Sequence, residues 1–283
     1  DFDVEEGTLN LDDAQKALER KPKLLAVGYA SNSLGTINPV KKIIDMAHEA
    51  GALVYIDAVQ YAPHGPIDVQ KLDCDFLISS AYKFFGTHSA ILYGKRNLLE
   101  KLFAYKVRPA TNKLPGKFET GTQNHEGIAG VLGAIEYFEW VGREFGSEFV
   151  AGLAGENYRG RQLELKKAMS AIHAYEIELS KALLSALNDV PGLRLYGLND
   201  VRRLDERVAT FSFRLNNMHP RVVAEKLAQE GIFAWDGNYY ALNVSERLGV
   251  EEQGGMVRVG AAHYNTLEEV ARLKDALIKI AAG

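Results

Sequence analysis

Two short segments carry side chains whose types and positions point to chemistry. One is residues 55–60 (Tyr-Ile-Asp-Ala-Val-Gln) and the other is residues 79–86 (Ser-Ser-Ala-Tyr-Lys-Phe-Phe-Gly). Asp57 closes one apolar run and Lys83 directly follows another, so both are predicted at the same edge of a sheet. A lysine whose amine is shielded from water between aromatic residues is suited to Schiff-base formation.

A Schiff-base lysine that works with pyridoxal phosphate (PLP) needs a second group. A carboxylate beside the pyridine nitrogen keeps that nitrogen protonated, so that the ring can take up carbanion charge. Asp57 has the right type and place for this role. Each residue alone has an ordinary explanation, because a lysine after a strand is usually solvated and an aspartate there usually forms a turn. Only the combination favours PLP chemistry.

The first half of the chain has the pattern of a buried sheet. Apolar runs predict strands at 24–29, 53–57, 76–80 and 90–93, and an amphipathic helix at 40–49 follows Pro39. Strands with continuous apolar runs, separated by helices, are typical of an α/β domain with a mainly parallel sheet. Polar residues just after such strands, as in the loop 30–35, lie where open α/β sheets bind ligands.

The second half of the chain has a different pattern of apolar and polar residues. Residues 96–123 are predicted to be irregular, 128–141 a helix, and 157–189 one long helix or two. A smaller α+β unit follows, with strands at 193–196, 208–215, 231–235 and 256–261 and helices at 220–230, 240–248 and 267–281. The alternation in 208–215 predicts a half-buried strand. We place the boundary in the helical region near 155–170, which gives domains at 1–160 and 161–283.

These motifs together resemble the class V aminotransferase group of PLP enzymes, and most closely its cysteine desulfurase and selenocysteine lyase branch. The matching segments occur in the order of that family at 31–40, 57–60, 68–76, 80–83, 118–122 and 258–261. The resemblance implies PLP fold type I, with a large domain that contains the sheet and a smaller C-terminal domain. Because the chain opens on Asp1 as if in mid-domain, we expect the N-terminal part of the large domain to be missing. The phosphate-cradling loop and the ring that stacks on PLP would lie there.

The resemblance also implies roles for residues at the cofactor. Lys83 would hold PLP and move protons at the substrate Cα, and Asp57 would pair with the pyridinium nitrogen. Gln60 would hydrogen-bond the phenolic oxygen of the ring, and Ser80 would donate to the phosphate. Tyr82 replaces a histidine that relatives often have, and its phenol can still donate a hydrogen bond.

Three further residues have implied roles toward the substrate and the partner subunit. Thr122 would reach the phosphate bound to the partner subunit, so a homodimer is implied. Asn32 and Arg258 would hold the carboxylate of an amino-acid substrate. The arginine fork suits this task because it can bind a carboxylate bidentately. Without the resemblance, a surface salt bridge would explain Arg258 about equally well.

One departure from the branch bears on the reaction. Desulfurases carry a cysteine in a Gly-His-His-Cys-Ala type motif, whereas residues 237–241 are Gly-Asn-Tyr-Tyr-Ala. Tyr240 thus takes the place of the cysteine, and Trp235 takes that of a nearby arginine. A phenol cannot accept a sulfane sulfur as a thiolate does. Cys74, the only cysteine, precedes a predicted buried strand, where it most often acts as a small hydrophobe.

These observations favour a lyase or β-elimination reaction on an amino acid, without a protein persulfide. Transamination and epimerisation follow closely, because this fold hosts them all. Two readings of another class are a catalytically silent scaffold and a PLP-binding sensor. The retained Lys83 and Asp57 argue against a silent scaffold, because nothing structural requires a lysine at that sheet edge.

Composition and charge argue against several other classes of protein. The 283-residue chain has a formal net charge of −4 and no block of like charges, so nucleic-acid binding through a basic surface has little support. No apolar stretch is long enough to cross a bilayer, and no basic-then-apolar leader opens the chain. The single cysteine fits a reducing cytoplasm. The seven histidines lack metal-ligand spacing, so no metal is expected.

Overall fold

The computed structural model describes residues 1–283. Contacts divide the chain into two compact units. Unit 1 consists of Asp1–Ala14, Tyr29–Pro39 and Met169–Gly283, and unit 2 consists of Gln15–Gly28 and Val40–Ala168. The domain boundary between residues 160 and 161 stays a prediction.

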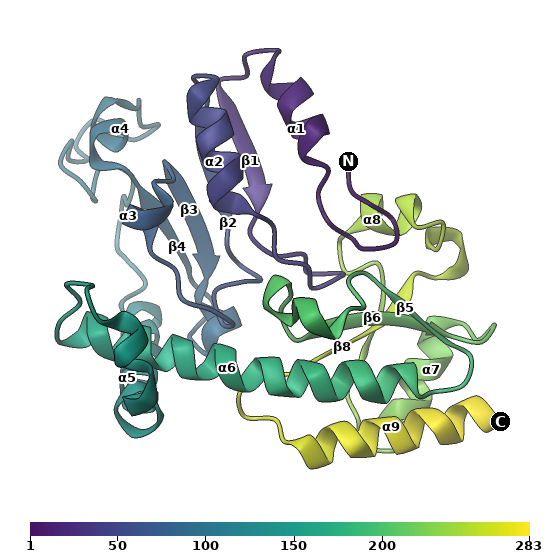
Figure 1. The fold of residues 1–283 in the computed structure, drawn as a ribbon. Coiled ribbons are helices and arrows are strands. Elements are labelled where there is room, and N and C mark those ends of the chain that lie inside the picture. Colours follow the sequence, from purple (N-terminus) through teal and green to yellow (C-terminus); the bar gives the residue numbers. More distant parts are fainter. The chain divides into compact units, whose positions relative to one another are not determined.

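Unit 2 contains a four-stranded sheet in the order β1-β2-β3-β4 (Figure 1). The strands are β1 (Leu24–Gly28), β2 (Leu53–Asp57), β3 (Phe76–Ser80) and β4 (Ala90–Gly94). The first three run parallel and β4 runs antiparallel to β3, which confirms a mainly parallel sheet. The connection 81–89 is shorter than the dozen or so residues that a parallel crossover needs, so β4 can only return antiparallel.

Helices complete unit 2. Of these, α2 (Val40–Glu49) buries its side chains at positions 40, 43, 44 and 47, which is the spacing of one helix face. The long helix α5 begins at His125 because the side chain of Asn124 accepts a hydrogen bond from the amide of Gly127. Helix α5 ends at Phe145, and the other helices are α3 (Val69–Leu72), η1 (Ala81–Phe84), α4 (Arg96–Lys101), η2 (Ser147–Phe149) and η3 (Ala151–Leu153). The stretch predicted as irregular therefore contains one short helix, α4.

Unit 1 contains a second sheet, antiparallel throughout, in the order β5-β6-β8-β7. Its strands are β5 (Leu193–Tyr196), β6 (Thr210–Leu215), β7 (Trp235–Gly237) and β8 (Met256–Gly260). Its helices are η4 (Val201–Glu206), α7 (Pro220–Gln229), α8 (Leu242–Arg247), η5 (Glu251–Gln253) and α9 (Leu267–Ala282). Two helices have residues in both units, α1 (Leu11–Leu18) and α6 (Arg161–Asn188).

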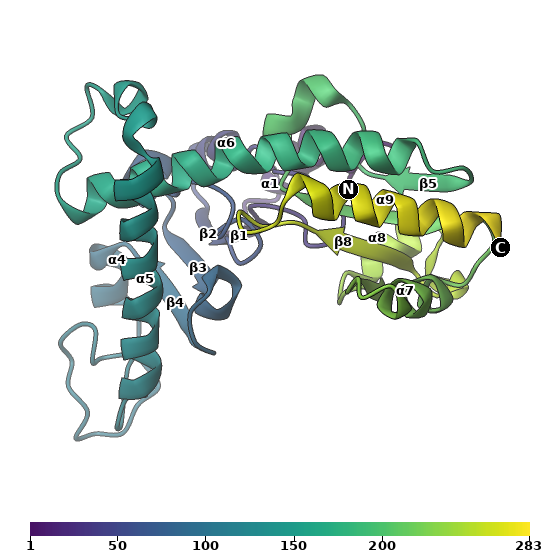
Figure 2. The same ribbon diagram turned by 90° about the horizontal axis from the view of Figure 1, so that it is seen from below.

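The core of unit 1 lies between one face of this sheet and three helices. Phe211 and Phe213 of β6 and Val257 and Val259 of β8 pack there. Figure 2 shows α9 alongside the C-terminal part of α6, and both helices contribute leucines to the same core. Burial of each large apolar side chain contributes about 1.5–3 kcal/mol to folding.

Two strand predictions in unit 1 are wrong in detail. The strand predicted at 231–235 is a connection, and β7 begins only at Trp235. Gly231 adopts a left-handed conformation (φ 70°) and the amide of Ile232 bonds back to Leu227, so the end of α7 uses these residues. The strand predicted as half-buried is covered on both faces, because Ser212 on its polar face is fully buried.

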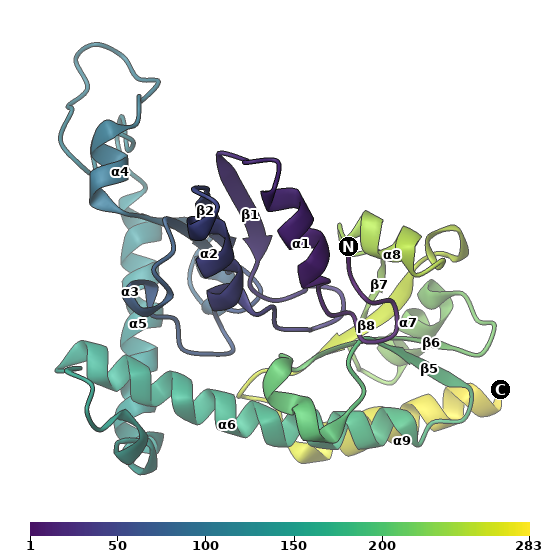
Figure 3. The same cartoon turned by 45° about the horizontal axis from the view of Figure 1, so that its top comes forward.

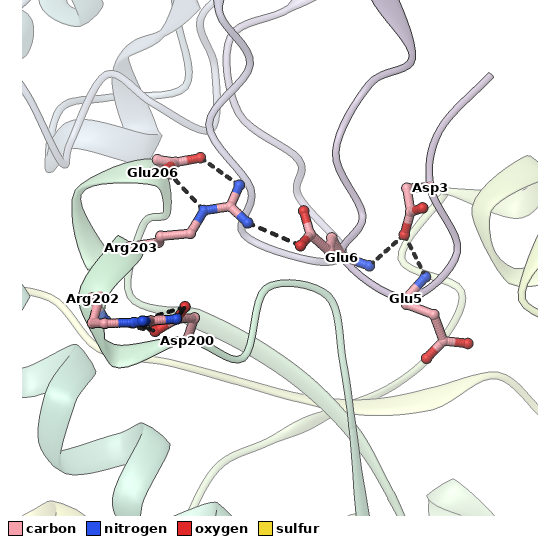
Figure 4. Close-up of polar contacts among 7 residues, drawn as sticks. All are labelled: Asp3, Glu5, Glu6, Asp200, Arg202, Arg203 and Glu206. Atoms are coloured by element: carbon pink, nitrogen blue, oxygen red, sulfur yellow. Dashed lines mark hydrogen bonds and ion pairs between the residues drawn. The ribbon is translucent and has the colours of Figure 1, made fainter.

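The N-terminal segment is part of unit 1 and is held by charged contacts. Asp3 accepts hydrogen bonds from the amides of Glu5 and Glu6, and Arg203 binds Glu6 and Glu206 at 2.7–2.9 Å (Figure 4). The first residue lies beside α8 (Figure 3), where its carboxylate is 3.1 Å from Arg247.

None of the helices combines the length and the apolar character that a membrane span requires.

Candidate active site

A short turn after β3 positions Lys83. The turn η1 is closed by Phe85 in a left-handed conformation (φ 68°), and the amide of Gly86 bonds to Ala81 at 2.8 Å. A Cβ at position 86 would come within 3.0–3.3 Å of Ala81, so a larger residue would fit there only if Ala81 shifted. The ring of Phe85 packs on the rings of Tyr137 and Phe138 of α5. Lys83 is therefore carried on a turn that packs against α5, and the Lys83 side chain is partly buried.

Asp57 lies at the carboxyl end of the neighbouring strand β2. In the ladder it is opposite Ile78 of β3, and the amide of Ala58 donates to Ile78 at 2.9 Å. One oxygen of its carboxylate accepts from the amide of Val59 at 2.9 Å, as in an Asx turn, and the side chain is exposed. The turn-forming role weighed from the sequence is therefore real, and this hydrogen bond uses only one of the two carboxylate oxygens.

The structure gathers several of the predicted cofactor residues at one sheet edge. Ser80 ends β3 at the same edge as Asp57, and Gln60 follows β2 within the next turn. The ring of Tyr82 is exposed and meets the ring of His88 edge-on, with centroids 5.0 Å apart. The ammonium of Lys83 lies 5.8 Å from the centroid of Tyr82.

Thr122 is not brought into contact with these residues. It is exposed in the connection that precedes α5, next to Gly121 in a left-handed conformation (φ 80°). It makes no hydrogen bond to Lys83 or Asp57. Its implied role, toward a partner subunit, stays a prediction.

Unit 1 brings Asn32 and Arg258 together through a third residue, Tyr239. The Nη1 group of Arg258 donates to the main-chain oxygen of Asn32 at 2.6 Å, and Nδ2 of Asn32 donates to the main-chain oxygen of Tyr239 at 2.8 Å. The guanidinium lies over the ring of Tyr239, 4.6 Å from its centroid. The phenol of Tyr239 donates to the main-chain oxygen of Met256, its neighbour across the loop. Each residue of the trio thus holds another in place.

Arg258 has no acidic partner in the chain. Burial lowers the pKa of its guanidinium, and the only charge effect on it comes from Tyr239. Burial also raises the pKa of the Tyr239 phenol, which therefore stays neutral. A partly buried cation without a counter-ion is unusual, because such charges are normally paired. The trio therefore provides a place for an anion such as a carboxylate.

The loop that carries Asn32 is clamped by a buried arginine. Arg207 donates to the main-chain oxygens of Leu198, Leu34 and Thr210, and its guanidinium lies 3.7 Å from the centroid of the Phe211 ring. Burial lowers its pKa. Sequence reasoning missed this residue, since a lone arginine before a strand resembles any surface residue.

Tyr240 and Trp235, which the resemblance places where desulfurases have a cysteine and an arginine, are both at the surface. Tyr240 is 98 % exposed and Trp235 is 62 % exposed. Cys74, by contrast, is completely buried, and burial raises the pKa of its thiol to about 11. A thiol of that kind stays protonated near neutral pH and is a poor nucleophile.

Comparison with models of known protein families shows which family this chain belongs to. The family model described as Aminotransferase class-V matches residues 3–148 and 142–273. The chain belongs to the class V aminotransferase family.

Relatives of this class V aminotransferase chain are named as desulfurases. It is 33 % identical over 289 residues to a cysteine desulfurase of Synechococcus elongatus and 34 % identical over 290 residues to one of Pectobacterium atrosepticum. In each case 98 % of this chain is covered, but only 41 % and 63 % of the relative. An apo cysteine desulfurase from Thermococcus onnurineus has the same fold, with a TM-score of 0.79 and 28 % identity over 99 % of this chain and 65 % of that one. The chain thus spans less than two thirds of these proteins.

Class V aminotransferases depend on PLP, and the donor set of unit 2 fits this cofactor. A carboxylate, a primary amine and a hydroxyl group come from Asp57, Lys83 and Ser80 at one end of adjacent strands. The carboxyl end of parallel strands is where open α/β sheets bind their ligands. The carboxylate matches a pyridinium nitrogen, the amine a carbonyl carbon and the hydroxyl a phosphate oxygen.

Proposed function

We propose that the protein is a PLP-dependent enzyme that acts on an α-amino acid by β-elimination or a related lyase reaction, without a protein persulfide. The observation that supports it most is the placement of Lys83 directly after β3, beside the strand that ends at Asp57. When bound, the cofactor supplies an electron sink for the carbanion formed at the substrate Cα. Lys83 holds the cofactor and moves the Cα proton, and Asp57 keeps the pyridine nitrogen protonated.

The other residues orient the reactants. Gln60 bonds the phenolic oxygen of the cofactor, and Ser80 and Tyr82 donate to its phosphate. Arg258 and the side chain of Asn32 hold the substrate carboxylate. The guanidinium is suited to this role because it lacks an acidic partner within the chain. Orientation of this kind lowers the barrier because the entropy of alignment is lost on binding rather than in the reaction.

The absence of a persulfide step is supported by two positions. Tyr240 is an exposed phenol where desulfurases carry their cysteine, and the thiol of Cys74 is buried with a raised pKa. Neither group can receive a sulfur atom from a substrate. We also propose that the protein is a cytoplasmic homodimer, with exposed Thr122 at the phosphate of the partner subunit. Light scattering on the full-length protein measures the oligomeric state.

The deciding experiment is the visible absorption spectrum of the full-length protein with PLP, beside Lys83→Ala. We expect a band in the wild type that is lost in Lys83→Ala and kept in Lys101→Ala, a matched change of an exposed lysine in α4. A band that is unchanged in Lys83→Ala would disprove the proposal and favour a silent scaffold.

A second measurement identifies the reaction. Amino acids that carry a leaving group at Cβ are added to the wild type. We expect ammonia and a 2-oxo acid in equal amounts, as β-elimination followed by hydrolysis requires. Transfer of the amino group to an added 2-oxo acid would identify an aminotransferase instead, and formation of the D-amino acid an epimerase. A spectral change without any product would identify a sensor.

A further inference from the structure

The register of the unit 1 sheet places Ser212 directly beside Arg258. Phe211 and Phe213 of β6 point into the helix-covered core, so Ser212 between them points to the opposite face. Arg258 of β8 lies directly opposite Ser212 in the ladder, and Tyr196 of β5 lies opposite it on the other side. Directly opposite residues of antiparallel strands share a face, with Cβ atoms about 5 Å apart. A small hydroxyl side chain therefore lies between an arginine and a tyrosine.

The hydroxyl group of Ser212 is buried and hydrogen-bonded. Ser212 is fully buried, and its Oγ donates to the main-chain oxygen of Ser33 at 2.5 Å. Burial raises the pKa of the nearby Tyr239 phenol, and a hydrogen bond with Ser212 opposes this effect in part. By contrast, the hydroxyl groups of Ser33 and Ser245 are buried without a hydrogen-bond partner. Ser212 is thus the one of these three hydroxyl groups that joins β6 to the loop 31–36.

Two successive carbonyl groups of the loop 31–36 are held by neighbouring strands. The oxygen of Asn32 accepts from Nη1 of Arg258 at 2.6 Å, and the oxygen of Ser33 accepts from Ser212. The loop is also closed on itself by a main-chain hydrogen bond of 2.9 Å between its first and last residues. A shift of the Ser33 carbonyl would therefore shift the Asn32 carbonyl as well.

The carbonyl of Asn32 decides which edge of Arg258 is left for a ligand. Nη1 of Arg258 donates to this carbonyl, whereas Nε and Nη2 make no hydrogen bond within the chain. Nε and Nη2 lie along one edge of the planar guanidinium, and such an edge can bind a carboxylate through two parallel hydrogen bonds. The orientation of this edge depends on one carbonyl oxygen, and that oxygen is held in place through Ser212.

We propose that Ser212 is a positioning residue for the substrate carboxylate. Its hydroxyl group holds the loop 31–36 against β6, so that the Asn32 carbonyl fixes Arg258 with its Nε and Nη2 edge toward the carboxylate. This inference rests on the proposed function and adds to it a residue that touches neither substrate nor cofactor. Without the hydroxyl group, Arg258 would keep its charge but would lose more rotamer freedom when a carboxylate binds.

The test uses full-length PLP-bound protein and acetate, which has the carboxylate but no amino group that could react. Calorimetry measures the acetate affinity of the wild type and of Ser212→Ala. We expect Ser212→Ala to weaken acetate binding by about five- to tenfold, because a hydrogen bond that fixes the binding group is lost. The visible band that depends on Lys83 should be unchanged in this variant, since Ser212 has no role at the cofactor.

The matched control is Ser245→Ala. This change also removes a fully buried hydroxyl group from unit 1, but the hydroxyl group of Ser245 has no hydrogen-bond partner. We expect Ser245→Ala to bind acetate as the wild type does. A loss that came only from removing a buried polar atom would appear equally in both variants.

Steady-state kinetics with the amino-acid substrate separates positioning from general damage to the enzyme. We expect Ser212→Ala to raise KM by about the same factor as the dissociation constant of acetate and to leave kcat within about twofold. The reason is that the hydroxyl group acts on the binding of the carboxylate and not on the chemistry at Cα. General damage to the enzyme would instead lower kcat.

Four results would overturn the role of Ser212. They are a wild type that binds no acetate, unchanged acetate affinity in Ser212→Ala, equal weakening in Ser245→Ala, and a lower kcat at unchanged KM. The spectrum of Lys83→Ala judges the proposed function separately. A band that depends on Lys83, together with any of these results, would leave the enzyme proposal standing and remove only the role of Ser212.

Discussion

Tyr239 holds the neighbouring guanidinium of Arg258 in a position where it can bind a carboxylate. Its ring supports the guanidinium of Arg258, its carbonyl holds the amide of Asn32, and its phenol is anchored on Met256. A flexible arginine loses rotamer entropy when it binds a carboxylate. Arg258 has already lost part of that freedom, because it is fixed from two sides before any ligand arrives.

We expect Tyr239→Leu to weaken carboxylate binding by about tenfold or more, because the ring under Arg258 is lost. The unfolding free energy should also fall, by about 2–4 kcal/mol, since a buried aromatic ring is replaced by a smaller side chain. Tyr239→Phe keeps the ring and loses one hydrogen bond, so its cost is about 1 kcal/mol and carboxylate affinity stays nearly unchanged. Calorimetry with acetate and urea unfolding measure the two effects. Equal loss of affinity in both variants would contradict a positioning role for the ring.

The buried thiol of Cys74 is expected to react slowly in the folded protein. With a pKa of about 11, only about 0.1 % of the thiol is ionised at pH 8. A thiol reagent should therefore modify the native protein at least about a hundredfold more slowly than the urea-unfolded protein. The measurement is the release of chromophore from a disulfide reagent. Fast labelling of the native chain would show that the thiol is accessible and would reopen a sulfur-transfer role.

Among the elements, the short helix α3 is tied to the connection before α6 through Asp68. This residue caps α3 by accepting from the amides of Gln70 and Lys71, and it also accepts from the phenol of Tyr158 at 2.7 Å. Lys166 of α6 lies 3.5 Å away. The carboxylate thus joins segments that are far apart in the sequence.

Stability should fall in acid as Asp68 takes up a proton. Burial by itself raises the pKa of Asp68, but the hydrogen bonds that it accepts and the charge of Lys166 outweigh burial and lower the pKa to about 2. Because the folded pKa is below the unfolded value of about 3.9, the contribution is complete above about pH 4 and is lost as pH falls through about 2. Asp68→Asn keeps the helix cap and loses only the charge.

Urea unfolding of the wild type and Asp68→Asn between pH 7 and pH 2 checks this prediction. We expect a wild-type advantage of about 1–2 kcal/mol at pH 7 that shrinks toward zero at pH 2. An advantage that does not depend on pH would show that the charge of Asp68 contributes nothing.

At the scale of the whole molecule, folding joins segments that are widely separated along the chain. Unit 1 combines Asp1–Ala14 and Tyr29–Pro39 with Met169–Gly283. Gly35 allows the close approach, because a Cβ there would lie 2.3 Å from the oxygen of Thr210. The buried guanidinium of Arg207 then bonds carbonyls from more than one of these segments.

We expect Arg207→Ala to lower the unfolding free energy by about 3–5 kcal/mol, because buried carbonyl oxygens lose their donor. Arg207→Lys should rescue little, since a single ammonium cannot reach the positions that the guanidinium fork spans. The matched control is Arg202→Ala, an exposed arginine paired only with Asp200, which should leave the thermal midpoint unchanged. Thermal unfolding measures all three. Recovery of the midpoint in Arg207→Lys would contradict the role of the fork.

The sequence by itself determined the elements whose patterns are local. The bounds of β2, β3 and α2 follow from continuous apolar runs and from a 3.6-residue repeat, because short-range burial and propensity decide them. The placement of Asp57 and Lys83 at one sheet edge follows in turn, since parallel neighbours end together. For these elements, the prediction from local sequence patterns and the tertiary structure agree.

Only the tertiary structure decided which distant residues meet. Trp235 and Ser212 become neighbours of Arg258 through strand register, and Tyr239 passes under Arg258 only because a strained turn directs it there. The polar face of β6 is buried although its alternation suggests exposure to water, because the loop with Asn32 contacts it. Such contacts depend on the packing of segments about two hundred residues apart. No periodicity within either segment encodes them.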